Sequence, residues 1–318
     1  MEHRFKPSRY FTTYGMNEPA FHVKPGDTVT AEAVDAGGND SQGNPIPDEM
    51  RQSVKGTVLS RSNPLTGPFF VDGAEIGDTL VVKIEAIRLN RQTAWSRHIP
   101  GFGSFTEEGS DRRLLLNDPI PERDFQWQLD LHRNVGRLDL PMSRKKSVEI
   151  PLHPFIGSMG VAPRYGRVEI ALSPGEYGGN MDCVETKAGT TVYFPVFAEG
   201  GYLALGDVHA AQGDGELCGV ALETSAEVTL RFDVIKEKQL DWPRMEDDQY
   251  IMVAGSSRPL MEAFKIAHVD LLSWLVSDYG FEKWEGFQLL SQVGTCRVGN
   301  VVDPKYTVIA KFPKKYLP

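Results

Sequence analysis

The sequence has few cysteines and no long apolar run. Only three cysteines occur among 318 residues, at Cys183, Cys218 and Cys296, so they cannot all pair. No segment reaches the ~18 consecutive apolar residues that mark a membrane-spanning helix. The opening residues MEHRFKPSRY lack the apolar core of a signal peptide. We therefore expect reduced thiols and a cytoplasmic protein that does not insert into a membrane.

An excess of positive charge is also absent. Lys and Arg together number 34 against 43 Asp and Glu, which gives a formal net charge of −9. Nucleic acids and anionic membrane surfaces are bound through basic patches, so this balance argues against both partners. Hydrophobic residues make up 41% and charged residues 24%, which indicates an ordinary globular chain rather than a disordered one.

Glycine and proline, by contrast, are frequent, and they separate short alternating segments. After the turn at 25–27, residues 28–32 alternate in polarity, and Leu80, Val82 and Ile84 share one face of a later segment. Similar patterns predict strands at 148–152, 168–172, 190–196 and 227–235. Many short strands with turn residues between them are typical of a β-sandwich or barrel, so the chain is predicted to be mainly β.

The pattern changes after residue 240. Apolar residues at three- and four-residue spacing predict an amphipathic helix over 259–279 that ends at Gly280. A shorter helix is predicted at 283–293 and a last strand at 306–312. We therefore predict a β-rich domain, 1–240, that carries the functional site, and a smaller α/β portion, 241–318, packed on it.

Polar side chains and glycines gather between residues 174 and 223. Asp207 and His209 stand two residues apart at the end of an apolar run, so on a strand they face the same side. A carboxylate and an imidazole on one face suit zinc or a similar divalent ion, although the two side chains can equally pair with each other in a loop. Asp182, which follows the turn at 178–180, is a third candidate ligand.

Five further residues are candidates for the same chemistry. In the segment after His209, one of Asp214 and Glu216 could ligate the metal while the other serves as a general base, or both could lie in an ordinary turn. Asp35 either reaches the metal from another strand or caps a glycine turn. His153, which precedes a proline, is a candidate donor to the substrate or a backbone-bonded histidine, and His98 is a weaker candidate of the same kind.

Five segments, in this order, resemble the acetamidase/formamidase family over nearly all of the chain. They are VDAGGN at 34–39, NPLTGPFFVDGAEIGDTLVV at 63–82, HPFIGSMGVAP at 153–163, PGEYGGNMD at 174–182 and GDVHAAQGDGE at 206–216. The last two are the most specific. The polar segment 107–146 is not part of this likeness; it is an excursion from the β core that we expect to lie near the mouth of the site.

The resemblance implies hydrolysis of short aliphatic amides, formamide or acetamide, to a carboxylate and ammonia. It also implies a β-rich fold with a smaller α/β part, a divalent metal such as zinc or calcium, and a homodimer or higher homo-oligomer. On matching positions it implies metal ligands at Asp35, Asp182, Asp207 and His209. We further expect Glu216 to act as the general base and His153 to stabilise the oxyanion.

Other chemistries are compatible with parts of the sequence. Cys183, Glu185 and Lys187 resemble the nucleophile set of a different amidase class, although they lie within five residues of one another. The pair Ser256-Ser257 resembles a serine amidase but lacks the surrounding glycine- and serine-rich stretch. A β-rich protein that binds a metal and a small ligand without turnover is a third alternative.

Overall fold

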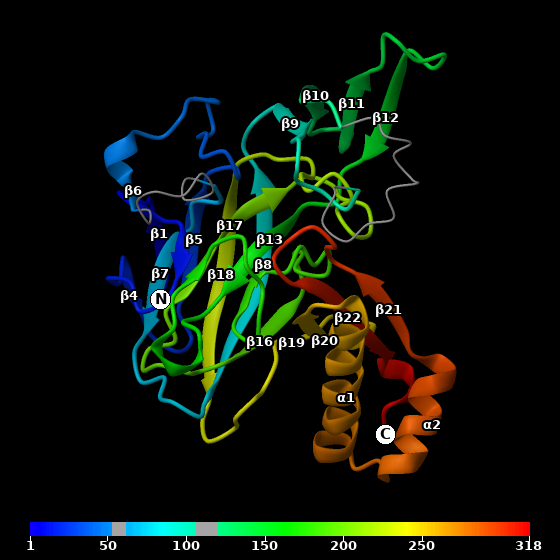
Figure 1. Ribbon diagram of the computed structural model, residues 1–318. Helices are drawn as coiled ribbons and strands as arrows, with labels where there is room; N and C mark the ends of the chain where they lie inside the picture. The colour runs from blue at the N-terminus through cyan, green and yellow to red at the C-terminus, as the bar shows by residue number, and fades with distance from the viewer. Residues whose placement is uncertain (53–61, 106–119) are drawn as a thin grey trace.

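The computed structural model describes residues 1–52, 62–105 and 120–318, which form mostly β-sheet with two helices near the C-terminus (Figure 1). The elements are β1 (Glu2–Phe5), β2 (Tyr10–Phe11), β3 (Thr13–Tyr14), β4 (Phe21–Val23), β5 (Thr28–Ala33), β6 (Arg51–Gln52), β7 (Thr66–Val71), β8 (Thr79–Leu89), β9 (Thr93–His98), β10 (Arg123–Asp130), β11 (Val135–Asp139), β12 (Ser147–Pro151), β13 (Phe155–Gly160), β14 (Glu169–Ile170), β15 (Gly178–Asn180), β16 (Thr191–Pro195), β17 (Leu203–His209), β18 (Ala226–Ile235), β19 (Arg244–Glu246), β20 (Tyr250–Ser257), α1 (Leu260–Tyr279), α2 (Lys283–Val293), β21 (Thr295–Val298) and β22 (Tyr306–Pro313). The predicted fold class, mainly β with a smaller C-terminal α/β portion, is confirmed.

Two sheets face each other across the main core. The nine-stranded sheet has the order β1-β5-β18-β8-β16-β19-β20-β22-β21, and the five-stranded sheet has the order β15-β13-β17-β7-β4. Along β5 and β18 the buried residues alternate with more exposed ones, as expected for strands with one face in the core. The core cluster joins apolar side chains of β5, β8, β16 and β18 to those of β7, β13 and β17. This packing is a sandwich.

β13 and β17 differ from the alternating strands because every residue of both is buried. They pair with each other, and β13 also pairs with β15. A strand that is buried on both faces contacts the core on one side and other protein on the other. The polar residues at the end of β17 and just after β15 come together at these buried strands, so this part of the five-stranded sheet positions the site.

The C-terminal portion extends the same nine-stranded sheet through β19, β20, β22 and β21. Helix α1 packs on it through a stripe of buried residues that includes Ala263, Ala267, Leu271 and Leu275, and it ends at Gly280 with φ of 70°, as predicted. The sheet therefore continues across residue 240. The division of the chain into two domains at that point stays a prediction.

The polar segment 107–146 is described from residue 120 onward, and its first part, 107–119, lies outside the described residues. The described part contains β10 and β11, which form a four-stranded sheet with β12 and β9 (Figure 1). This sheet has its own small apolar core around Trp127 and Leu129. Separately, neither α1 nor α2 is long and apolar enough to cross a bilayer.

Candidate active site

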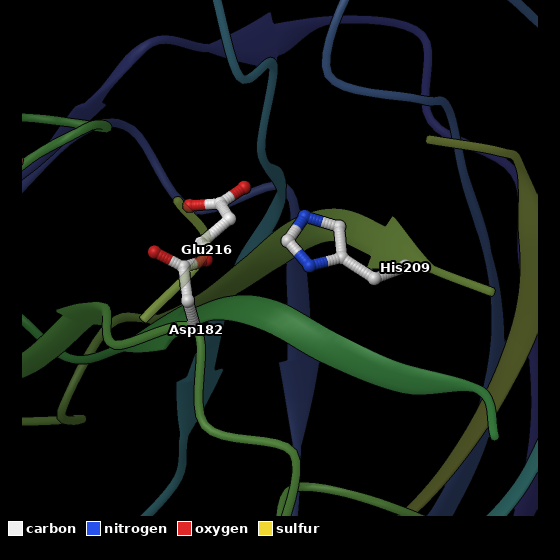
Figure 2. A group of neighbouring side chains, drawn as sticks. All are labelled: Asp182, His209 and Glu216. Carbon is white, nitrogen blue, oxygen red and sulfur yellow. The ribbon is translucent and has the colours of Figure 1, made fainter. Parts of the chain in front are cut away.

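Acidic side chains and one histidine are buried together where β15 and β17 end. The members are Asp182, Asp207, His209, Glu216, Glu223 and Asp303, each less than a tenth exposed. Asp182 follows β15, His209 ends β17, and Glu216 lies in the loop after it. Figure 2 shows the carboxylates of Asp182 and Glu216 beside each other, with the His209 ring pointing toward them. Such a concentration of negative charge inside a protein requires a compensating proton or cation.

His209 is held so that one ring nitrogen faces carboxylates. Its Nδ1 lies 2.9 Å from Oε1 of Gln212. The amide nitrogen of Gln212 donates to two backbone carbonyls at 3.1 and 2.9 Å, which fixes the direction of the amide. Oε1 must then accept a hydrogen bond from Nδ1–H, so in the neutral imidazole Nε2 carries the lone pair. Nε2 lies 3.2 Å from Oδ1 of Asp207 and 3.3 Å from Oε1 of Glu223.

These contacts have the spacing of ligands around a small cation. Zinc bonds to nitrogen and oxygen of about 2.0–2.2 Å in a tetrahedron place neighbouring ligand atoms about 3.3–3.6 Å apart. Within the described residues, Nε2 of His209, Oδ1 of Asp182 and Oε2 of Glu223 are buried without a hydrogen-bond partner. Two groups of three residues each have their ligand atoms within 4.8 Å of one another: Asp182, His209 and Glu216 form one group, and Asp207, His209 and Glu223 form the other. The donor set fits a divalent ion such as zinc.

Neutral polar groups orient the carboxylates. Oδ2 of Asp207 accepts hydrogen bonds from Asn63 at 3.1 Å and Ser158 at 3.3 Å. Oδ2 of Asp182 accepts one from Asn180 at 3.1 Å. In both residues the other oxygen is left for a ligand role. Hydrogen-bond partners of this kind fix the orientation of metal-binding side chains, so these neutral residues help to set the geometry of the site.

The backbone at the site is unusual for non-glycine residues. Asp182, Asp207 and Glu216 have φ of 48°, 57° and 48°, and Asn63 has 51°. Left-handed conformations are uncommon outside glycine and tend to cluster at functional sites, where surrounding structure imposes them. Gly157 of β13 completes the arrangement, because a Cβ there would lie 2.9 Å from both Oδ1 of Asp182 and Oδ2 of Asp207. Only glycine leaves room for the two carboxylates.

Burial and mutual repulsion shift the pKa values of the cluster. Burial raises the pKa of Asp182, and the charges of Asp303 and Asp207 raise it further. Burial likewise raises the pKa values of Glu216 and Glu223, with neighbouring carboxylates adding to each. Burial alone would lower the pKa of His209, but the carboxylates of Glu223 and Asp207 outweigh it and raise the value. Without a cation, the folded cluster therefore retains protons.

This proton uptake predicts opposite pH responses for the metal-free and metal-loaded protein. Raised carboxyl and histidine pKa values mean that the folded metal-free chain binds more protons than the unfolded chain, so its stability is greatest at low pH. We expect its melting temperature to fall as pH rises from the ordinary carboxyl range, near 4, through the neutral range. With zinc bound, the slope should reverse in this range, because protons compete with metal. Thermal melts with and without zinc test this, and parallel slopes would contradict it.

A pocket of about 670 Å³ adjoins the cluster. Glu216 and Gln212 line it, so it reaches both the acidic group and the residue that orients His209. Its described lining also includes Ser96, Trp127, Ile150, Pro151, His153, Val184, Lys187, Ala211, Gly213, Asp214, Leu217, Cys218, Val220, Ala221, Leu222 and Arg297. Trp127 comes from β10, so the polar segment outside the family likeness contributes to the pocket wall.

The structure brings together four of the residues expected from the sequence, Asp182, Asp207, His209 and Glu216. Asp35 lies outside these ligand groups although it is fully buried. Its Oδ2 accepts from Arg91 at 2.8 Å and from the indole of Trp95 at 2.9 Å, and Asn39 binds its Oδ1 at 2.8 Å. Asp35 thus has the partners of a carboxylate that ties a loop to neighbouring strands.

The remaining expected residues have separate surroundings. His153 is exposed and lines the pocket. Asp214 is also exposed and pairs with Arg297. His98 ends β9 and packs edge-on against Phe125 of the neighbouring strand. Of these residues, His153 and Asp214 lie at the pocket.

Three residues of the site were not expected from the sequence. Glu223 ends the polar region 174–223, and its backbone forms a bridge with that of His209. Gln212 lies within the segment GDVHAAQGDGE. Asp303 accepts a hydrogen bond from Asn180 at 2.8 Å but lies 123 residues from it in sequence. The first two stood in segments already singled out, whereas no local pattern marks Asp303.

The alternative nucleophiles have core surroundings. Cys183 is completely buried, its Sγ lies 3.4 Å from Oε2 of Glu185, and burial raises the pKa of its thiol. Glu185 pairs with Lys311 at 2.8 Å. Ser256 is buried in β20 and shares a hydrogen bond with Thr307. A protonated thiol without access to the pocket and a hydroxyl inside a sheet are both poorly suited to attack an amide.

Comparisons with known proteins agree with the sequence resemblance. The family model described as "Acetamidase/Formamidase family" matches residues 16–169 and 167–313. A formamidase of Methylophilus methylotrophus is 28% identical over 260 residues, which cover 68% of this chain and 61% of that protein. The chain thus spans about three fifths of the length of such relatives.

Solved structures show the same likeness over whole chains. An acetamidase from Yersinia enterocolitica has a TM-score of 0.85 and 38% identity, covering 100% of this chain and 93% of the other. An acetamidase from Bacillus halodurans has a TM-score of 0.81 and 30% identity, covering 98% of each chain. Both similarities extend across the two sheets and the C-terminal helices.

Proposed function

We propose that this chain, which belongs to the acetamidase/formamidase family, is an amidase. It hydrolyses small amides, such as formamide or acetamide, to a carboxylate and ammonia. The observation that carries the proposal is a set of buried ligand atoms next to a pocket that have no hydrogen-bond partner within the described part of the chain, namely Nε2 of His209, Oδ1 of Asp182 and Oε2 of Glu223. It supports a cation-dependent hydrolase better than a packed structural core, in which buried polar atoms are satisfied.

In this proposal His209, Asp207 and Glu223 hold a divalent ion, and Asp182 faces the same space. The neutral imidazole favours zinc over calcium, which prefers six to eight oxygen ligands. The ion, when bound, supplies a Lewis acid that acidifies water and polarises a carbonyl group. Asp35, with its oxygens bound by Arg91, Trp95 and Asn39, is left out of the proposed ligand set.

The protein groups move the protons. Glu216 lies in both the acidic cluster and the pocket lining, so it is placed to accept a proton from the attacking water and to return it to the leaving nitrogen. His153, on the pocket wall, donates to the carbonyl oxygen as negative charge develops there. Gln212 keeps the His209 tautomer in which Nε2 has its lone pair free.

The proposal includes a cytoplasmic location and a homodimeric or higher assembly, both of which are predictions. It includes no nucleic-acid or membrane partner, in keeping with the net charge of −9.

Ammonia release by purified protein, with and without a chelator, tests the proposal. We expect the protein to hydrolyse formamide or acetamide and to contain about one zinc or similar divalent ion per chain. Removal of the metal by the chelator should abolish turnover, and added zinc should restore it. Turnover that survives complete removal of metal would contradict the metal-dependent mechanism. Metal and amide binding without any ammonia would instead favour the alternative of a non-catalytic binding protein.

A further inference from the structure

The pocket is much larger than the amides of the proposed function. Its volume of about 670 Å³ corresponds to about twenty water molecules at roughly 30 Å³ each. Formamide and acetamide have only a few non-hydrogen atoms and would leave most of this space to solvent. Pockets of roughly 300–1,000 Å³ typically enclose ligands of drug-like size. The volume therefore suits a substrate with a substantial group attached to the amide.

The walls of the pocket are apolar on two sides. Trp127, Ile150 and Pro151 come from the four-stranded sheet, and Leu217 and Val220 come from the loop that carries Glu216. Leu217 is 49% exposed, so about half of its apolar surface is open to solvent. Apolar surface of this kind, rimmed by polar residues, marks ligand-binding grooves.

Trp127 is the residue of this wall whose side-chain orientation is fixed by a hydrogen bond. It is only 9% exposed, and its Nε1 donates a hydrogen bond to Oγ of Ser96 at 3.1 Å. Ser96 also lines the pocket. The hydrogen bond and the packing against Leu129 and Leu222 fix the direction of the indole. A rigid aromatic wall favours a flat apolar group over a flexible polar one.

The charged side chains that line the pocket do not favour an ionic substrate. Asp214 and Arg297, both in the lining, pair with each other and cancel. Glu216 belongs to the acidic cluster and is assigned to proton transfer. The other charged side chain of the described lining, Lys187, is exposed. The polar end of the pocket thus suits a neutral carboxamide, and the walls suit an uncharged apolar remainder.

We propose that the preferred substrate is a primary amide whose acyl group carries an apolar ring of about phenyl size, with Trp127 as a specificity-determining residue. This proposal rests on the amidase function. The reaction is the same hydrolysis: the water oxygen bonds to the carbonyl carbon, the C–N bond breaks, and the nitrogen leaves as ammonia with a proton from the water. The acid that forms passes its remaining proton to the ammonia, so the products are an arylalkyl carboxylate and ammonium.

The test compares four amides with the zinc-loaded protein, namely formamide, acetamide, phenylacetamide and acetanilide, by release of ammonia or aniline. We expect kcat/KM for phenylacetamide to exceed that for acetamide by about tenfold or more, since even small apolar groups give factors of this size in fitted pockets. Equal or lower values for phenylacetamide would overturn this inference alone. Faster cleavage of acetanilide would overturn the assignment of the ring to the acyl side. Failure to hydrolyse any amide would overturn the amidase function and the inference together.

Two variants test the wall itself. Trp127→Ala should lower the ratio of kcat/KM for phenylacetamide to that for acetamide by about tenfold. Leu217→Ala removes exposed apolar surface, so it folds readily and should lower the same ratio in the same direction. The matched control is Trp284→Ala on α2, where the side chain is 65% exposed. This control should leave kcat/KM for phenylacetamide and for acetamide unchanged. An equal loss for both substrates in the two pocket variants would show a merely structural role and would overturn the inference.

Discussion

His209→Asn should remove the bound ion and the amidase activity together. Nε2 of His209 faces Asp207 and Glu223 at 3.2 and 3.3 Å, and His209 is common to both ligand groups of the cluster. Asparagine is shorter and presents no equivalent nitrogen lone pair. Loss of an outer-shell partner typically costs about 10–100-fold in metal affinity or activity, so loss of a central ligand should exceed that range. Metal content and ammonia release, measured on the same preparation, check the result.

The control for this variant is His132→Asn, in the exposed turn between β10 and β11. It changes the same residue type away from the cluster and should leave metal and turnover at the wild-type level. A structural histidine at 209 would give a different outcome. Stability would then fall by about 1–2 kcal/mol through a lost buried hydrogen bond, while metal content per folded chain stayed level. That result would contradict the placement of the ion at His209.

Local periodicity predicted the elements that local sequence determines. The spacing of apolar residues located helix 260–279 and its end at Gly280, because an amphipathic face and a glycine C-cap are both local features. Alternation located β5, β8 and β18 for the same reason. The two-residue spacing of Asp207 and His209 also placed both side chains in one group, since they end a real strand, β17.

Long-range pairing explains what the sequence left open. Glu223 reaches His209 because the two segments pair in an isolated antiparallel bridge, and no spacing in the sequence encodes that contact. The sequence left Asp35 open as a metal ligand or a turn cap, because the partners that engage it, Arg91 and Trp95, lie 56 and 60 residues away. The role of the segment around Trp127 as a pocket wall likewise depends on how two sheets meet rather than on its own composition.

Glu216→Gln should abolish most turnover and leave the ion in place. General acid–base groups contribute about 10²–10⁴-fold to rate, so we expect kcat to fall by about a thousandfold. The amide of glutamine keeps the size of the side chain but cannot accept a proton. The ion should stay because His209, Asp207 and Glu223 hold it independently of Glu216 in the proposed ligand set.

The matched control for Glu216→Gln is Glu237→Gln. Glu237 shares the left-handed backbone, with φ of 56° against 48° for Glu216, but it is exposed and is not among the described residues that line the pocket. Its variant should keep wild-type kcat, which separates a loss of chemistry from any effect of amide substitution at such a backbone position. Loss of metal together with turnover in Glu216→Gln would make Glu216 a ligand rather than the base. Near wild-type turnover would place the base elsewhere, and Asp182, whose Oδ1 has no partner among the described residues, would be the next residue to substitute.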